Sequence, residues 1–290
     1  QYKIAVIEDN PYGELNFEKK RYKIITLENS FHGRTITTVK ATGQSSFHQS
    51  KFAPYPDGFS FNAIDDVYNA IDDETVAVMI ELVQGEGGVF PFDKEKIKEL
   101  AKFLKENDIL LIIDEVQTGV FRTGEFLASN LYDIEPDIIT LAKGIGGGVP
   151  MGAVMTKHKD IWTAGDHGST FGGNYLVTAA ALEVLDILEN LKDSGALDET
   201  IIYFTKKLND IFEANRDIFI THVGLGLMRG LRVKDADTLA SLIKTAFEFG
   251  VMVLKSGNNT LRFLPALTIS KSEIDEGFIR LQKAITKIKS

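Results

Sequence analysis

The chain has 290 residues, 44% hydrophobic and 25% charged, which is the composition of a globular protein. Its formal net charge of −9 argues against general binding to nucleic acid or anionic membranes, because both need a basic surface. The absence of cysteine excludes disulfides, thiol catalysis and cysteine-ligated metals. No apolar run approaches the ~18 residues of a membrane span and we find no secretory signal, so we expect a soluble, cytoplasmic protein.

Short apolar runs predict strands along the first part of the chain, and most end in a charged or glycine-rich turn. The β-branched runs at 76–80, 109–113 and 137–142 are typical of buried strands of a parallel sheet. Residues 94–107 read as an amphipathic helix. The strands are expected at 2–7, 22–27, 76–80, 109–113, 137–142 and 152–156.

Beyond Asn174 the pattern changes to long helices separated by short strands. Helices are expected at 175–191, 198–214, 236–249 and 272–289, and strands at 226–233, 251–254 and 261–264. The alternation predicts an α/β protein with a mainly parallel sheet in a large domain at 1–186 and a smaller α/β domain at 187–290. The length agrees with about two domains of ~150 residues.

Two of the predicted strands each deliver one charged residue at the carboxyl end, where open α/β sheets place their ligands. Asp114 follows 109–113 and Lys143 follows 137–142. We expect this lysine to be shielded from solvent, because it directly follows a buried strand. Burial lowers the pKa of a lysine, and a partly neutral amine forms Schiff bases with carbonyls. An aspartate beside it suits a pyridine aldehyde cofactor, whose ring nitrogen a carboxylate keeps protonated. Alternatively, the lysine caps a helix or pairs with Glu115, and the aspartate caps a helix or binds Mg²⁺. A phosphate-binding loop is disfavoured because Lys143 precedes its glycines.

Five ordered motifs then carry a family resemblance: Ser30–Thr35 (SFHGRT), Glu81 with Gln84–Gly88 (QGEGG), Asp114–Gly119 (DEVQTG), Leu141–Gly144 (LAKG) and His167–Asn174 (HGSTFGGN). Together they resemble the class-III aminotransferases, pyridoxal-phosphate enzymes of the aspartate-aminotransferase fold. Within that class the closest resemblance is to the acetylornithine branch. It covers about residues 21–290, so it implies a pyridoxal-phosphate transferase fold for nearly the whole chain.

The resemblance implies a role for each cofactor residue. Lys143 would form the Schiff base and move the proton, and Asp114 would bind the pyridine nitrogen. Val116 would pack on one ring face and Phe31 on the other, while Gln117 would hydrogen-bond near the ring hydroxyl. The implied cofactor-binding residues are Phe31, Asp114, Glu115, Val116, Gln117, Lys143 and Thr170.

It also implies substrate-binding residues. Arg34 would bind the carboxylate of the acylated amino acid, and Arg262 that of 2-oxoglutarate, since arginine's planar fork matches a carboxylate. Glu86 is similar to a family glutamate that pairs with this arginine and switches it between substrates. Ser169 and Thr170 resemble residues that reach the active site of a partner subunit, touching substrate and cofactor phosphate, which implies a homodimer.

The implied reaction moves an amino group from N-acetylornithine to 2-oxoglutarate, in arginine biosynthesis. Alternatives are a class-III enzyme acting on ornithine, 4-aminobutyrate or succinyl-diaminopimelate, or a scaffold of this fold with impaired catalysis. We find no histidine spacing that indicates a metal site. His32 is interpreted as a hydrogen-bonded loop residue, and Arg122 and Arg229 as surface or helix-pairing charges.

The N-terminal part departs from the family pattern. Family members carry a Gly-Thr turn at a helix N-terminus that binds the cofactor phosphate, and we find none upstream of Phe31. Residues 1–20 are atypical, and 6–15 resemble a class I/II aminotransferase segment in which Asp9 would take the role assigned here to Asp114. We therefore expect a fused or shortened family member.

Overall fold

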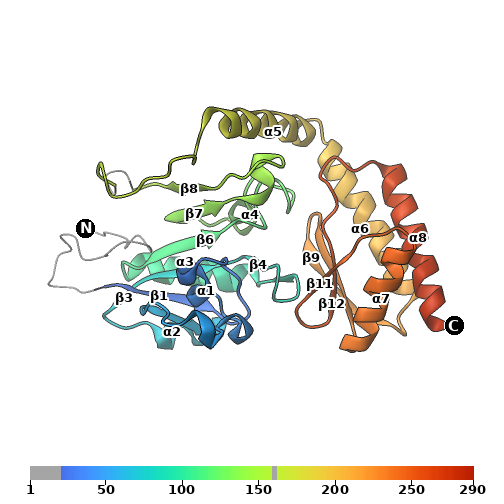
Figure 1. The fold of residues 1–290 in the computed structure, drawn as a ribbon, viewed down its shortest axis with the longest axis horizontal. Coiled ribbons are helices and arrows are strands. Elements are labelled where there is room, and N and C mark those ends of the chain that lie inside the picture. Colours follow the sequence, from blue (N-terminus) through green and yellow to red (C-terminus); the bar gives the residue numbers. More distant parts are fainter. Residues whose placement is uncertain (1–20, 159–161) are drawn as a thin grey trace. The chain divides into compact units, whose positions relative to one another are not determined.

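The computed structural model describes residues 21–158 and 162–290 (Figure 1). The described chain divides into two compact units. The first unit runs to Leu82 and continues through Phe92–Val116 and Ser129–Thr178. The second comprises Val83–Pro91, Gln117–Ala128 and Ala179–Ser290. The predicted division into domains at residue 186 stays a prediction. The strand expected at 2–7 and the segment that resembles class I/II enzymes lie outside the described residues.

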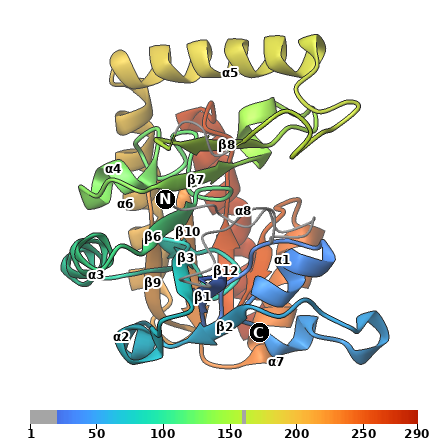
Figure 2. The same cartoon turned by 90° about the vertical axis from the view of Figure 1, so that its left-hand side faces the viewer.

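A six-stranded sheet forms the core of the first unit, in the order β2-β1-β3-β6-β7-β8. All neighbours are parallel except β7 and β8, which are antiparallel. The central strands β3 and β6 are buried at every residue, which explains their unbroken apolar sequences. Figure 2 shows α3 on one side of this sheet and α1 on the other. The strands are β1 (Lys23–Leu27), β2 (Phe59–Asn62), β3 (Thr75–Ile80), β6 (Leu110–Asp114), β7 (Ile138–Leu141) and β8 (Ala153–Thr156), and the helices are α1 (Ile36–Ala41), α2 (Val67–Ala70), α3 (Lys94–Glu106) and α4 (Ala128–Tyr132).

The second unit contains an antiparallel sheet in the order β11-β12-β10-β9. Figure 1 shows α6, α7 and α8 together on one side of it. Ser270 and Glu273 form a reciprocal capping box at the start of α8. The elements are β4 (Val83–Gln84), β5 (Phe90–Pro91), α6 (Ala196–Ala214), β9 (Phe219–Leu225), β10 (Met228–Val233), α7 (Ala236–Glu248), β11 (Leu254–Ser256), β12 (Thr260–Phe263) and α8 (Lys271–Lys289), while α5 (Tyr175–Asp193) contributes residues to both units.

The strand prediction was wrong in some details. The strand expected at 251–254 begins only at Leu254, because the residues before it pair with no neighbour in the described sheet. The strands β2, β4, β5 and β9 were not predicted. Helix α5 and the other four long helices agree with the predicted ranges to within two residues at most ends.

Alternation along β12 sends consecutive side chains to opposite faces of its sheet. The Phe263 ring contacts Phe204 of α6 and Phe278 of α8, with centroids 6.3 Å away in each case. Arg262 therefore faces away from these helices. Its direct neighbour across the ladder is Gly230, which has no side chain to occupy that face.

We expect Gly230→Ala to destabilise the protein, because a Cβ there would lie 2.5 Å from Thr260 Cγ2 and 3.1 Å from Val223 Cγ2. Overpacking of this kind costs about 1–3 kcal/mol. The matched control is Gly277→Ala on α8, where a Cβ meets nothing within 4 Å and the better helix former stabilises by about 0.5–1 kcal/mol. Urea unfolding would measure both, and equal unfolding midpoints for the two variants would contradict the packing argument.

Candidate active site

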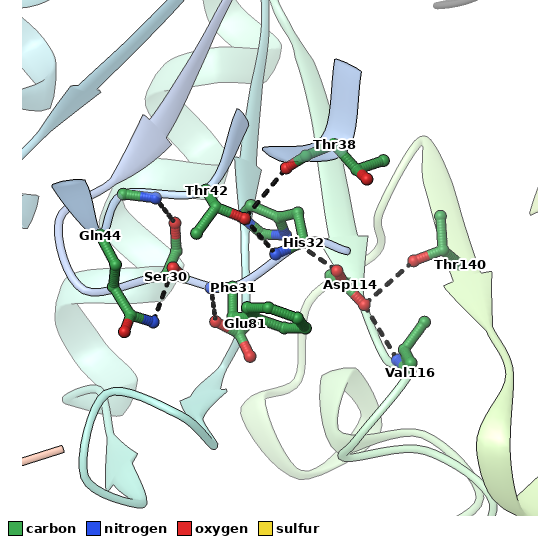
Figure 3. A network of polar contacts seen from close by, with 11 residues as sticks. Ser30, Phe31, His32, Thr38, Thr42, Gln44, Glu81, Asp114, Val116 and Thr140 are labelled. Atoms are coloured by element: carbon green, nitrogen blue, oxygen red, sulfur yellow. Dashed lines mark hydrogen bonds and ion pairs between the residues drawn. The ribbon is translucent and has the colours of Figure 1, made fainter. Parts of the chain in front are cut away.

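Asp114, the last residue of β6, is the centre of a polar network at the carboxyl edge of the first sheet (Figure 3). Its Oδ2 lies 2.8 Å from Nδ1 of His32. Its Oδ1 accepts hydrogen bonds from the Val116 amide at 3.0 Å and from the Thr140 hydroxyl at 3.2 Å. Thr140 is the register partner of Asp114 on β7, so sheet pairing itself brings the hydroxyl to the carboxylate. With an exposure of 7%, the carboxylate is nearly buried but still reachable from one side.

The loop that follows β1 is fixed by hydrogen bonds to its backbone (Figure 3). The His32 amide donates to Thr42 Oγ1 at 3.0 Å, and the Phe31 amide donates to the buried Glu81 carboxylate at 2.9 Å. Gly33 has φ +135°, and a Cβ there would lie 2.6 Å from Thr38 Oγ1. Only glycine fits this position, so the turn that presents His32 to Asp114 depends on it.

The His32 side chain is almost completely buried. Burial works to lower its pKa, but the hydrogen bond and charge of Asp114, together with the charge of Glu81, outweigh it and raise the pKa above the ordinary 6.5. Nε2 of the ring is buried and has no hydrogen-bond partner in the described part of the chain. His32 is therefore a buried partner of Asp114, and its interpretation as a hydrogen-bonded loop residue is confirmed.

Lys143 follows β7 and begins a short 3₁₀ turn, with φ +48°. A left-handed conformation is uncommon for a residue with a side chain and is found most often at functional sites. The expectation that this lysine is shielded from solvent was wrong, because Lys143 is exposed. The physical reason is that the strand ends at Leu141, and the turn carries the following residues beyond the sheet edge. Asp114 ends β6 and Lys143 follows β7, and these two strands are adjacent and parallel. Both residues therefore lie at the same edge of the sheet, as predicted.

Arg34 packs against aromatic rings of the same unit. Its guanidinium carbon lies 4.5 Å from the centroid of Phe47 and 5.5 Å from that of Phe31, and these two rings contact each other. Arg34 makes no ion pair with any residue that the structure describes. It also lines a pocket of about 500 Å³ with Ile36, Val39, Phe47, Gln49, Phe52 and Tyr55. A guanidinium that stacks on aromatic rings beside apolar side chains can bind the carboxylate of a partly apolar substrate.

Arg262 and its partners belong to the second unit. NH1 donates to Glu86 Oε1 at 2.7 Å and to the Gly85 carbonyl at 3.0 Å, while Gln117 Oε1 lies 3.4 Å away. Arg262 is 7% exposed, so removal of Glu86 would leave a nearly buried charge in need of another anion. The predicted pairing of Glu86 with Arg262 is therefore present. Gln117 faces this arginine in the structure, and its contact with the cofactor ring stays a prediction.

The remaining predicted residues are placed as follows. Glu115 is buried, and its Oε1 accepts a hydrogen bond from the Ser129 amide in α4 at 2.8 Å. Ser169 and Thr170 are exposed, and Ser169 Oγ accepts from the Gly172 amide at 2.9 Å. The Glu115 amide also donates to the Thr140 carbonyl at 3.0 Å. The roles of Glu115, Ser169 and Thr170 stay predictions.

The sequence interpretation missed Thr140 and misjudged two arginines. Thr140 carried a signal, since it is the one polar residue within the apolar run 138–141. Arg122 is not a surface charge: burial lowers its pKa to about 10, and NH1 donates to the carbonyls of Pro265 at 2.6 Å and Leu227 at 3.3 Å. Burial likewise lowers the pKa of Arg229, which donates to the Gly224 carbonyl at 3.0 Å. Both arginines bind backbone carbonyls rather than acidic side chains.

The His32–Asp114 pair makes stability depend on pH. Because the folded state raises the His32 pKa, the stabilisation from His32 is complete below pH 6.5 and is lost as pH rises through the folded pKa. We expect the stability difference between wild type and His32→Gln, measured by urea unfolding, to be larger at low pH. His222→Gln is the control of opposite sign, because burial lowers the His222 pKa and its contribution is lost as pH falls below 6.5. Parallel pH profiles for the two variants would contradict this assignment.

Comparison with known proteins gives one family for nearly the whole chain. Residues 7–285 match the model of the family "Aminotransferase class-III". The chain is 56% identical over 272 residues to the acetylornithine aminotransferase of Wolinella succinogenes, covering 93% of this chain and 69% of that protein.

Solved structures agree. An ornithine aminotransferase from Toxoplasma gondii ME49 superimposes with a TM-score of 0.85 at 28% identity, over 92% of this chain and 65% of that one. An N-acetylornithine aminotransferase from Stenotrophomonas maltophilia K279a gives a TM-score of 0.75 at 30% identity, over 93% and 67%. The chain thus spans about two thirds of the length of these relatives, and it belongs to the class-III aminotransferases, a family of pyridoxal-phosphate enzymes.

Proposed function

We propose that this chain carries the active-site residues of an acetylornithine aminotransferase, which moves the amino group of N-acetylornithine to 2-oxoglutarate with pyridoxal phosphate. The observation that carries this proposal is the Asp114 carboxylate, oriented by His32, Thr140 and Val116 at a sheet edge where the next strand leads to Lys143. The 56% identity to a relative of that name supports the choice of substrate. We find no observation that favours the ornithine, 4-aminobutyrate or succinyl-diaminopimelate alternatives, or an inactive scaffold.

The donor set at Asp114 fits the proposed cofactor. A nearly buried carboxylate, with both oxygens already oriented, suits a protonated pyridine nitrogen. When bound, pyridoxal phosphate supplies the carbonyl that exchanges the amino group and a ring that takes up electrons. Lys143 would hold the cofactor through Nζ, and the same amine would carry the proton that the exchange requires. Lys143 is an exposed residue at the end of the strand next to Asp114.

The other cofactor contacts follow from the family resemblance. Phe31 and Val116 would pack on the two faces of the ring, and Gln117 would hydrogen-bond near its hydroxyl. Thr170 would bind the phosphate, and Glu115, which follows β6, would support the site through its hydrogen bond from the Ser129 amide in α4. Phe31 is well suited to this role because hydrogen bonding of its amide to Glu81 restricts the backbone that carries the ring.

Substrate binding uses two arginines with different surroundings. Arg34 binds the carboxylate of the acylated amino acid, and the apolar lining of its pocket accommodates the carbon chain. Arg262 binds a carboxylate of 2-oxoglutarate, which displaces Glu86 from the guanidinium. When the substrate end is uncharged, Glu86 returns and neutralises the buried arginine.

An exposed apolar surface on the first unit supports a homodimer whose active site includes residues from both chains. Tyr175 is 95% exposed and Leu176 is 73% exposed, and Phe171 and Val154 of the same unit are also exposed. Contiguous exposed apolar side chains mark protein–protein interfaces, and three of these residues lie within six positions of the sequence. Ser169 and Thr170 lie next to Phe171 in the sequence, so association through this surface would bring them to the interface, consistent with roles in the partner's site.

The names of the relatives support a setting in arginine biosynthesis, and we propose a cytoplasmic location, with which the net charge of −9 is compatible. No helix among the described residues is long and apolar enough to cross a membrane.

Lys143→Ala is expected to abolish transamination, because no other amine replaces the proton carrier; the loss is about 10³-fold or more. Borohydride treatment after incubation with pyridoxal phosphate should attach the cofactor to the peptide containing Lys143 in wild type, as detected by mass spectrometry. Asp114→Asn should keep this attachment but lower kcat. The control is Lys157→Ala, on a lysine paired with Asp137. Attachment at the same level in Lys143→Ala would disprove the assignment.

Leu176→Arg is expected to raise the dissociation constant of the dimer about tenfold or more, since an unpaired charge would enter an apolar interface. Sedimentation velocity over a range of protein concentrations measures this. Ile202→Arg is the matched control, because Ile202 is 70% exposed on α6, outside the proposed interface. An unchanged association constant for Leu176→Arg would contradict this interface.

A further inference from the structure

The short turn that carries Glu86 is attached to the hairpin between β11 and β12. The buried Ser256 hydroxyl donates to the Gly85 carbonyl at 2.7 Å and accepts a hydrogen bond from the Gly88 amide at 2.9 Å. One hydroxyl therefore connects the residues on both sides of Glu86 and uses its donor and an acceptor to do so.

Two more bonds join the hairpin to the same turn. The Gly257 amide donates to the Glu86 carbonyl at 2.9 Å, and Asn258 Nδ2 donates to the Gly87 carbonyl at 2.9 Å. The contact is too close for side chains, because a Cβ on Gly257 would lie 2.8 Å from the Glu86 carbonyl oxygen. The backbone of the Glu86 turn is thus fixed on three consecutive residues of the hairpin.

The same hairpin carries Arg262. In the β11–β12 ladder Ser256 pairs with Thr260 and Leu254 pairs with Arg262, so Ser256 and Arg262 lie on the same face of the sheet. Arg262 donates to Glu86 at 2.7 Å. One element therefore sets the positions of both members of this ion pair, and all of these residues belong to the second unit.

We propose that Ser256 and Asn258 are positioning residues that set the substrate discrimination of the enzyme by holding Glu86 against Arg262. This inference rests on the proposed function, in which Arg262 binds a carboxylate of the oxo acid. A well-placed Glu86 neutralises Arg262 when the substrate end is uncharged, and a dicarboxylate must displace it. Looser placement weakens the neutralisation, which disfavours acyl-ornithine and favours a dicarboxylate.

The test measures the two half-reactions of the holoenzyme separately by stopped-flow absorbance. For Ser256→Ala we expect kcat/KM for N-acetylornithine to fall about tenfold, the fold-change of one lost buried hydrogen-bonding group. The KM for 2-oxoglutarate should stay the same or fall. Asn258→Gly should shift the two half-reactions in the same directions, and it preserves the left-handed backbone at φ +52°. Ser256→Thr, which keeps the hydroxyl, should restore the wild-type ratio.

Ser270→Ala is the control for general destabilisation, because it removes the cap of α8 in the same unit without touching the Glu86 turn. It should lower thermal stability and leave the ratio of the half-reactions unchanged. In the Glu86→Gln background, Ser256→Ala should change the ratio no further, since its effect passes through Glu86. Equal losses in both half-reactions, or additive effects with Glu86→Gln, would overturn the inference. A wild type inactive toward both substrates would overturn the proposed function, and this inference with it.

Discussion

The buried carboxylate of Asp114 constrains the first unit more than any other group. A charge removed from water is costly unless donors replace the lost solvent, and here the donors come from three separate places. His32 belongs to the loop after β1, Thr140 to β7, and the Val116 amide to the turn that follows Asp114 itself. Strand pairing, loop conformation and turn geometry must therefore all be correct before this carboxylate is satisfied. The hydrogen bonds that the loop amides of His32 and Phe31 donate to Thr42 and Glu81 help to fix the loop conformation.

The second unit contains a nearly buried group of the opposite charge, which likewise needs partners to replace the lost solvent. Arg262 is nearly buried on a strand, and alternation separates it from Phe263, which packs among the aromatic rings of α6 and α8. The guanidinium instead meets Glu86 and the Gly85 carbonyl. A buried arginine with a single, displaceable carboxylate suits an enzyme that binds two different substrates in turn. In the proposed function, a carboxylate substrate takes the place of Glu86, whereas an uncharged group leaves the pair intact.

Much of the fold followed from local pattern. The runs at 76–80, 109–113 and 137–142 became β3, β6 and β7, because β-branched apolar residues favour strands buried on both faces. The long helices followed from spacing and capping residues. By contrast, β2 has the sequence Phe-Ser-Phe-Asn and is extended because it pairs with β1. Similarly, β9 takes its strand conformation from a long ladder with β10. Pairing with a neighbour is not visible in a short, partly polar run.

The sequence by itself determined which chemical groups end the strands, that Asp114 and Lys143 share one sheet edge, and the family to which the motifs belong. These are local properties: periodicity identifies a strand, and the residue after it is delivered at the carboxyl end. Only the tertiary structure decided which groups meet. His32 and Asp114 are 82 residues apart and Arg262 and Glu86 are 176 apart. Their contacts, and the exposure of Lys143, depend on register between strands and on the path of turns, which no pattern within a short window encodes.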